Sequence, residues 1–230
     1  MEGKKFIEEN SMSIQGVDVL CWKDENPETA VINFSSMNPG KFERWSWFKS
    51  KPLSKPAVYI FMKDEGQNFY LGHKNNPLCD KLSDFLLDKL SLNNVPLSSA
   101  AAVGASMGGY ASIYSALKMG LKFSISINPQ VDYESACLHK FGLWKRKILE
   151  SAWVDLDSYI EDKSNEIKKS HIELCHGLYP ADLSASNKLE NALISRGVSY
   201  SKHQEASAEH GWLYYNSETL IDKINSLFYG

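Results

Sequence analysis

The chain has 230 residues, of which 43% are hydrophobic and 23% charged, so wholesale disorder is excluded and one domain with a sizeable core is favoured over two independent ones. The formal net charge is −3, from 25 Lys and Arg against 28 Asp and Glu, and this balance disfavours nucleic acid as a partner. The sequence shows no signal peptide and no apolar run near the ~20 residues that cross a bilayer, so we expect no transmembrane segment. Four scattered cysteines without a C-x-x-C pair favour reduced thiols and a cytoplasmic location.

Short apolar segments alternate with helical patterns along nearly the whole chain, which predicts an α/β fold with a mostly parallel sheet and helices on both faces. In chain order the predicted elements are strands 18–22, 30–34 and 57–61, helix 77–90, strand 100–105, a helix after Ser106 that Gly120 ends, strand 123–128, a helical insertion 131–168, strand 172–175, helix 186–196, strand 198–203 and helix 220–228. We therefore expect a single domain over residues 1–230, with 131–168 as a cap-like insertion over the sheet.

Residues 104–109, Gly-Ala-Ser-Met-Gly-Gly, form a G-x-S-x-G motif between a predicted strand and a predicted helix. In this context a serine lies on a strained strand-to-helix turn, with its hydroxyl above the edge of the sheet. Gly104 and Gly108 have no Cβ to collide where strand and helix approach each other. The helix N-terminus and the amide of Met107 would face an oxyanion formed next to Ser106. The motif predicts Ser106 as a nucleophile; the alternative is a glycine-rich turn that only joins a strand to a helix.

A serine nucleophile needs a base to take its proton and an acid to orient that base. In a doubly wound sheet the loops at the carboxyl ends of the strands converge on one edge, and the loops after the last two predicted strands contain Asp182 and His210. The order Ser106, Asp182, His210 is that of one hydrolase architecture, so we predict these residues as nucleophile, acid and base. One alternative stays open: Asp182 could only cap the helix that follows it, with Asp132 as the acid.

A second oxyanion amide is expected from the loop after strand 30–34, where the backbone amides of Ser36 and Met37 are the candidates. A metal site is not expected. His171, Cys175 and His176 lie on or beside a predicted strand, in which consecutive residues face opposite sides, and no fourth ligand is evident.

Aromatic residues in two segments are candidates for substrate binding. The loop after the predicted strand 30–34 contains Trp45, Trp47 and Phe48, which could line an acyl or sugar pocket, and the insertion 131–168 contains Tyr133, Trp144 and Trp153. Flat aromatic faces suit sugar rings, and an insertion at this place in the chain would lie over the edge where Ser106 emerges. The alternative for each is a side chain that packs in a satellite core.

Short motifs along the chain resemble the α/β-hydrolase superfamily, from about residue 31 to the end. The strand and loop 32–36 (Ile-Asn-Phe-Ser-Ser), the glycine-rich turn at Ser106, and 127–132 (Ile-Asn-Pro-Gln-Val-Asp) are more closely similar to bacterial capsular polysaccharide O-acetyltransferases of this fold. That resemblance implies acetyl-CoA as donor, a glycan hydroxyl as acceptor and an acetyl-serine intermediate. It places the nucleophile at Ser106, the acid at Asp182 and the base at His210, although the spacing before Asp182 is longer than in the family.

The sequence leaves three classes of function open: an acyltransferase, an esterase that uses the same covalent serine, and an inactive hydrolase fold used for binding. No bound cofactor is expected; the partners would be a small-molecule acyl donor and a glycan acceptor. Four basic residues of the insertion could contact an anionic glycan or the phosphates of CoA, or form a solvated helix face. These residues are Lys140, Lys145, Arg146 and Lys147.

Overall fold

A computed structural model describes residues 2–38, 40–140, 142–162, 169–210 and 215–229. Its main sheet has eight strands in the order β1-β2-β4-β3-β7-β8-β9-β10. The strands of this sheet are β1 (Ser11–Ile14), β2 (Val17–Lys23), β3 (Thr29–Phe34), β4 (Ala57–Asp64), β7 (Ala100–Ala105), β8 (Phe123–Ile127), β9 (His171–His176) and β10 (Tyr200–Gln204). The pairs β1–β2 and β2–β4 are antiparallel and the remaining pairs are parallel. The predicted mostly parallel sheet is confirmed.

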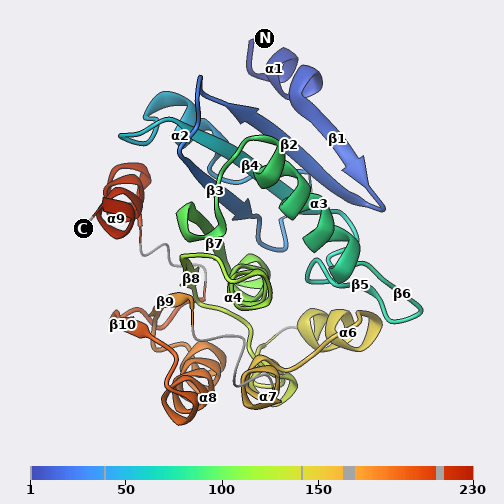
Figure 1. Ribbon diagram of the computed structural model, residues 1–230. Helices are drawn as coiled ribbons and strands as arrows, with labels where there is room; N and C mark the ends of the chain where they lie inside the picture. The colour runs from blue at the N-terminus through green and yellow to red at the C-terminus, as the bar shows by residue number, and fades with distance from the viewer. Residues whose placement is uncertain (1, 39, 141, 163–168, 211–214, 230) are drawn as a thin grey trace.

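Helices cover both faces of the sheet (Figure 1). They are α1 (Glu2–Asn10), α2 (Trp45–Ser50), α3 (Cys79–Leu92), α4 (Met107–Met119), α5 (Tyr133–Ala136), α6 (Leu143–Glu150), α7 (Leu156–Asp162), α8 (Pro180–Arg196) and α9 (Ser217–Tyr229). A 3₁₀ turn, Leu97–Ser99, precedes β7, and a two-stranded ribbon, β5 (Gly72–His73) and β6 (Asn76–Pro77), precedes α3. Among the described residues, no helix has the length and apolar character required to cross a membrane.

The core lies in two layers because consecutive residues of a strand face opposite sides of the sheet. In β4, Ile60 and Met62 belong to the layer that packs against α3, α4 and α8. Tyr59 and Phe61, which alternate with them, belong to the layer that packs against α2 and α9. The central strands β3, β4, β7 and β8 are buried almost throughout, as expected for strands covered on both faces.

The structure contains elements that the sequence did not predict, among them α1, β1, α2 and the β5–β6 ribbon, and one predicted helix begins earlier. An N-terminal helix and strand, α1 and β1, precede the first predicted strand; β1 is largely exposed and lacks an apolar pattern. Helix α8 begins at Pro180 rather than at 186, because proline at the first helical position needs no amide partner. In the insertion 131–168 the described residues form α5, α6 and α7, whereas residues 141 and 163–168 lie outside the described part of the chain.

Candidate active site

Ser106 occupies the turn between β7 and α4 with a φ of 55° and a ψ of −119°. A positive φ is costly for a residue with a side chain, so the surrounding structure must hold the turn. The Ser106 amide donates to the carbonyl oxygen of Ile127 at 2.8 Å, which ties the turn to the end of β8. A Cβ on Gly104 would lie 2.0 Å from the Gly108 carbonyl oxygen, and one on Gly108 would lie 2.2 Å from the Phe34 carbonyl oxygen. The two glycines are therefore required where α4 crosses the strands.

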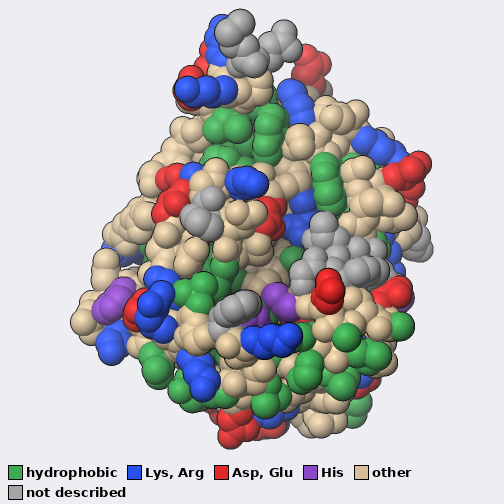
Figure 2. Space-filling view, turned by 180° about the vertical axis from the view of Figure 1, so that it is seen from behind, with side chains coloured by type: hydrophobic (Ala, Val, Ile, Leu, Met, Phe, Trp, Pro, Cys, Tyr) green, Lys and Arg blue, Asp and Glu red, His purple; other side chains and the backbone are tan. Residues whose placement is uncertain are grey.

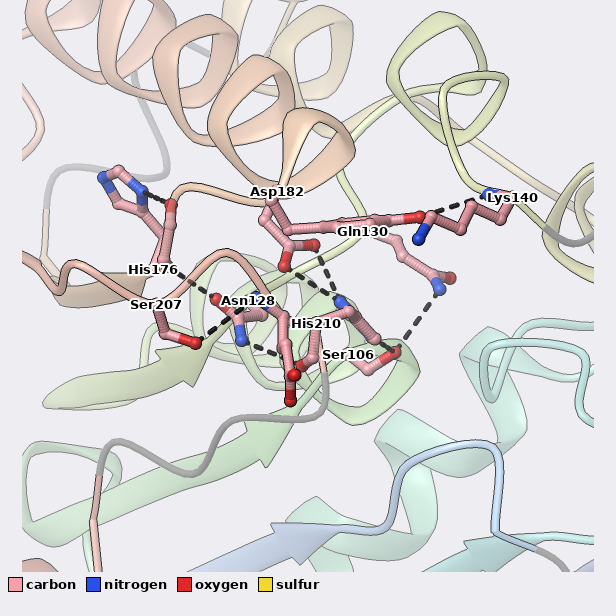
Figure 3. A network of polar contacts seen from close by, with 11 residues as sticks. Ser106, Asn128, Gln130, Lys140, His176, Asp182, Ser207 and His210 are labelled. Carbon is pink, nitrogen blue, oxygen red and sulfur yellow. Dashed lines mark hydrogen bonds and ion pairs between the residues drawn. The ribbon is translucent and has the colours of Figure 1, made fainter.

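Ser106, His210 and Asp182 come together at the carboxyl edge of the sheet (Figure 3). Nε2 of His210 lies 2.9 Å from Oγ of Ser106, and Nδ1 of His210 lies 2.8 Å and 3.0 Å from the two carboxylate oxygens of Asp182. Asp182 is 1% exposed, whereas 20% of the His210 side chain reaches solvent. Asp182 lies in the first turn of α8, next to the positive end of that helix's dipole.

The alternative acid, Asp132, has other partners. Its Oδ1 accepts from the amide of Ser135, which caps α5, and from Nζ of Lys188 at 2.8 Å. Its other oxygen, Oδ2, is buried without a partner among the described residues. Of the two carboxylates considered from the sequence, the structure brings Asp182 to His210.

The predicted oxyanion amides have different surroundings. Met107 is the first residue of α4, so its amide has no acceptor within the helix and remains beside Ser106. The amide of Ser36 instead donates to Oε2 of Glu43 at 3.1 Å, and the Ser36 hydroxyl donates to Oε1 of the same carboxylate. Because of this contact the Ser36 amide is not free to donate to an oxyanion, contrary to the prediction. Met37, the other candidate from the same loop, lines the pocket beside Ser106.

A pocket of about 490 Å³ opens onto Ser106 and His210. Its other lining residues come from the loop after β3, from α2, from the ends of β7 and β8, and from α6: Ser36, Met37, Glu43, Arg44, Trp47, Ala105, Ile127, Asn128, Leu143 and Trp144. Seen from behind (Figure 2), histidine side chains reach the surface near the middle of that face, with basic and acidic side chains close by. No single sign of charge dominates there.

Of the aromatic residues predicted to bind substrate, Trp47 and Trp144 line this pocket. Trp45 is turned away and stacks on Phe6 with ring centroids 5.9 Å apart. Trp47 takes its place at the pocket, because two residues along a helix are separated by about 200° around its axis. Tyr133, in α5, is 37% exposed and does not line the pocket. Trp45 and Tyr133 therefore do not contribute to the wall of this pocket.

Trp144 also contacts the candidate base. Its ring lies edge-on to the His210 imidazole, with centroids 4.5 Å apart at 71°. Trp144 also stacks on the ring of His139, with ring centroids 3.7 Å apart. Helix α6 therefore contributes both a pocket wall and a packing partner for His210.

Two features of the site were missed by the sequence reasoning. Gln130 is 2% exposed and donates from Nε2 to Oγ of Ser106 at 3.3 Å. It belongs to the Ile-Asn-Pro-Gln motif noted above, but the motif by itself predicts no role for this side chain.

The second feature is the pair of Arg44 and Glu43. Arg44 has a φ of 66° and a side chain that is 5% exposed, and its Nη1 lies 3.3 Å from Oε2 of Glu43. Burial lowers the pKa of Arg44, and the Glu43 carboxylate acts in the opposite direction and offsets part of this shift. No local motif marks this pair.

The remaining candidates are not gathered at the site. His171 contacts Ser199 and Glu173 at the edge of the sheet, whereas the buried His176 ring bonds the carbonyl oxygen of Gly177. Within the described ranges, no group of three or more His, Cys, Asp or Glu side chains could hold a metal ion. All four cysteines are free thiols.

The basic residues of the insertion have mixed surroundings. Lys147 donates to the carbonyl oxygen of Gly66 at 2.9 Å, and Arg146 faces Glu150 at 3.8 Å on the surface of α6. The backbone amide of Lys140 donates to the Tyr179 hydroxyl at 3.1 Å. None of these contacts shows a role in binding a substrate.

With this geometry in place, comparisons with known proteins identify the family. The profile of the Esterase family, described as "Putative esterase", matches residues 29–223. The chain belongs to this family, which is part of the α/β-hydrolase superfamily. The match runs from β3 into α9 and includes Ser106, Asp182 and His210. A comparison with curated protein sequences found no match.

Solved structures with the same fold include acyltransferases and hydrolases. The capsule O-acetyltransferase of Neisseria meningitidis serogroup A superposes with a TM-score of 0.70 at 14% identity, over 94% of this chain and 93% of that chain. A variant of that enzyme in complex with CoA gives 0.68 at 15% identity, over 93% and 94%. FphF, a fluorophosphonate-binding serine hydrolase of Staphylococcus aureus, gives 0.66 at 11% identity, over 96% and 98%. The predicted α/β-hydrolase fold is confirmed, and the family match identifies this chain as an enzyme of the esterase family.

Proposed function

We propose that this esterase-family enzyme transfers acyl groups through a covalent acyl-serine at Ser106, with His210 as general base and Asp182 as the acid that orients it. The observation that carries the proposal is the unbroken hydrogen-bonded chain from Oγ of Ser106 through both nitrogens of His210 to Asp182. Because the carboxylate accepts from Nδ1, the proton of the neutral imidazole is on Nδ1 and Nε2 is free to accept the serine proton.

The reaction has two halves in this proposal. His210 takes the proton of Ser106 as Oγ attacks the acyl carbonyl carbon, and the tetrahedral intermediate then collapses, with His210 returning the proton to the leaving group. An acceptor hydroxyl next gives its proton to His210 and attacks the acyl-serine. As the bond between Oγ and the acyl carbon breaks, His210 returns a proton to Oγ, which releases the ester product and restores Ser106. Asp182 stays ionised throughout and stabilises the imidazolium.

The oxyanion of each tetrahedral intermediate is assigned to two backbone amides, those of Met107 and Met37. Met107 lies at the N-terminus of α4, where the helix dipole adds to the hydrogen bond. Met37 takes the place expected of Ser36, whose amide is held by Glu43. Loss of one such donor costs about 10²- to 10³-fold in kcat in other enzymes.

For the substrates, we propose acetyl-CoA as donor and a glycan hydroxyl as acceptor. The fold shared with a capsule O-acetyltransferase, one variant of which was solved with CoA, supports this choice. The aromatic side chains of Trp47 and Trp144 in the pocket wall suit a sugar ring. We also propose a cytoplasmic location, which the four free cysteines favour.

Ester hydrolysis is the second candidate, and the match to the Esterase family favours it. The substrate would be an acetylated glycan or a small carboxylic ester. Both candidates share every step up to the acyl-enzyme and differ in whether water or another hydroxyl attacks it. An inactive binding module is disfavoured by the hydrogen-bonded Ser106, His210 and Asp182.

The experiment is to incubate the purified protein with acetyl-CoA and, separately, with p-nitrophenyl acetate, each with and without oligosaccharide acceptors. Mass spectrometry of the peptide that contains Ser106 then detects the acetyl adduct, with Ser106→Ala as the control. Release of CoA that depends on the acceptor, with acetylated oligosaccharide as product, supports the transferase. Rapid release of p-nitrophenol that no acceptor changes supports the esterase. A protein that turns over neither donor and forms no adduct overturns both.

A further inference from the structure

Asn128 lies directly after β8, between the segments that carry the nucleophile, the acid and the base. It is 2% exposed, and its φ of 45° places it in the left-handed region. Its backbone amide donates to the carbonyl oxygen of Cys175 at 2.8 Å, and the preceding carbonyl oxygen, of Ile127, accepts from Ser106 at 2.8 Å. The backbone at the end of β8 therefore holds both the turn of the nucleophile and the end of β9.

The side chain of Asn128 joins the two remaining loops (Figure 3). Its Oδ1 accepts from the amide of Gly177 at 3.0 Å, at the start of the segment that leads to Asp182. Its Nδ2 donates to the carbonyl oxygen of His210 at 3.1 Å. One carboxamide therefore contacts both the loop of the acid and the backbone of the base residue.

The loops that Asn128 joins are also close to each other. The amide of Leu178 donates to the carbonyl oxygen of Ser207 at 2.6 Å, and a Cβ on Gly177 would lie 2.5 Å from that same oxygen. His210 lies beyond the end of β10, so the strand ladder does not fix its backbone. The contact with Asn128 supplies a fixed point at the base residue itself.

We propose that Asn128 is a positioning residue, which holds the backbone of His210 in register with Asp182 and Ser106. This inference rests on the proposed function. Its physical reason is that a displacement of about 1 Å between reacting groups costs on the order of 10²-fold in rate. A carboxamide suits the position because it supplies a donor for His210 and an acceptor for Gly177 together.

Asparagine, aspartate and glycine are the residues that tolerate the left-handed backbone, so substitutions among them separate the side chain's role from backbone strain. Asn128→Asp keeps an acceptor for Gly177 but loses the donor to His210. Asn128→Gly keeps the backbone freedom and loses both contacts. The matched control is Ser124→Ala on β8, the strand that precedes Asn128. It removes a buried 3.1 Å hydrogen bond to Ser112, which is not part of the active site.

The test is the rate at which a fluorophosphonate labels Ser106, because this probe needs neither the natural donor nor the acceptor. We expect both Asn128 variants to reach the parent's final extent of labelling, at a rate about 10- to 100-fold lower. With an activated acetyl ester, kcat should fall by a similar factor while KM stays within about 3-fold. The Ser124→Ala protein should label at the parent's rate.

The split between kcat and KM is the readout that a purely structural role would not produce. A displaced His210 slows the chemical step for every folded molecule, whereas a loss of folded protein lowers the final extent of labelling and leaves the rate of the remainder unchanged. Parent-like labelling rates in both variants overturn the positioning role and leave the proposed function intact. A parent protein that is not labelled at all overturns the proposed function, and the positioning role with it.

Discussion

His210 Nε2 lies 2.9 Å from Ser106 Oγ, although 104 positions separate the two residues in the sequence. The opposite nitrogen of the same ring faces both oxygens of Asp182. The carboxylate therefore selects the tautomer in which Nε2 can accept a proton from the serine. This relationship defines the chemistry that the following predictions test.

Replacing Ser106 by alanine should lower turnover of an activated acetyl ester by about 10⁴-fold or more, because the nucleophile is lost. The thermal midpoint should stay near that of the parent or rise, since strained active-site residues are commonly kept for function rather than for stability. Steady-state assays and differential scanning calorimetry measure the two quantities. A variant with parent-like turnover would show that another residue is the nucleophile.

Asp182→Asn should lower the rate by about 10⁴-fold, the effect described for a base held in the wrong tautomer in a serine protease. Asp132→Asn is the matched control, because Asp132 caps α5 and pairs with Lys188 without contacting His210. It should reduce stability and leave the rate within about 3-fold. The assignment of the acid fails if Asp132→Asn is the more damaging change in kcat.

Trp144→Leu should lower kcat/KM by roughly 10-fold, because it removes a pocket wall and the edge contact of about 0.5–1.5 kcal/mol with His210. Tyr133→Ala, in the same insertion but away from the pocket, should stay within about 2-fold of the parent. The measurement is kcat/KM for one activated ester with all three proteins. Equal losses in the two variants would show that the insertion acts only as structural cover.

Charge reversal at Lys145 and Arg146 tests whether α6 also attracts an anionic substrate. If it does, KM for acetyl-CoA should rise a few-fold at low salt and less at high salt, as expected for exposed charges. The kcat for a small neutral ester should not change. If KM is the same in variant and parent across the salt range, these residues form a solvated helix face.

Burial lowers the pKa of His176 from its ordinary value of 6.5, so the folded state binds fewer protons at this residue than the unfolded state does. Its contribution to stability is therefore complete above about pH 6.5 and is lost as the pH falls toward the lowered pKa. In His176→Gln the free energy of unfolding should depend less on pH between about pH 7 and 5. Urea titrations at several pH values measure this, and identical slopes would contradict it.

Features that depend on neighbouring residues could be predicted from the sequence. The glycines at 104 and 108 indicated a serine turn because the steric limits of that turn apply to adjacent backbone atoms. The apolar pattern of strand 57–61 predicted a buried strand for the same local reason. The order of Ser106, Asp182 and His210 along the chain predicted three residues that meet, because parallel strands bring their carboxyl ends to one edge.

Features that depend on contacts between distant segments could be established only from the folded structure. It brought His210 to Asp182 rather than to Asp132. In that structure the Ser36 amide donates to Glu43. The side chain of Asn128 hydrogen-bonds both to the loop that leads to Asp182 and to the backbone of His210. Side-chain contacts of this kind depend on loop paths and on the angle at which a helix docks. Loop paths and docking angles produce no periodic pattern in the sequence, because loops have no repeating geometry and because a docking angle depends on both packed surfaces.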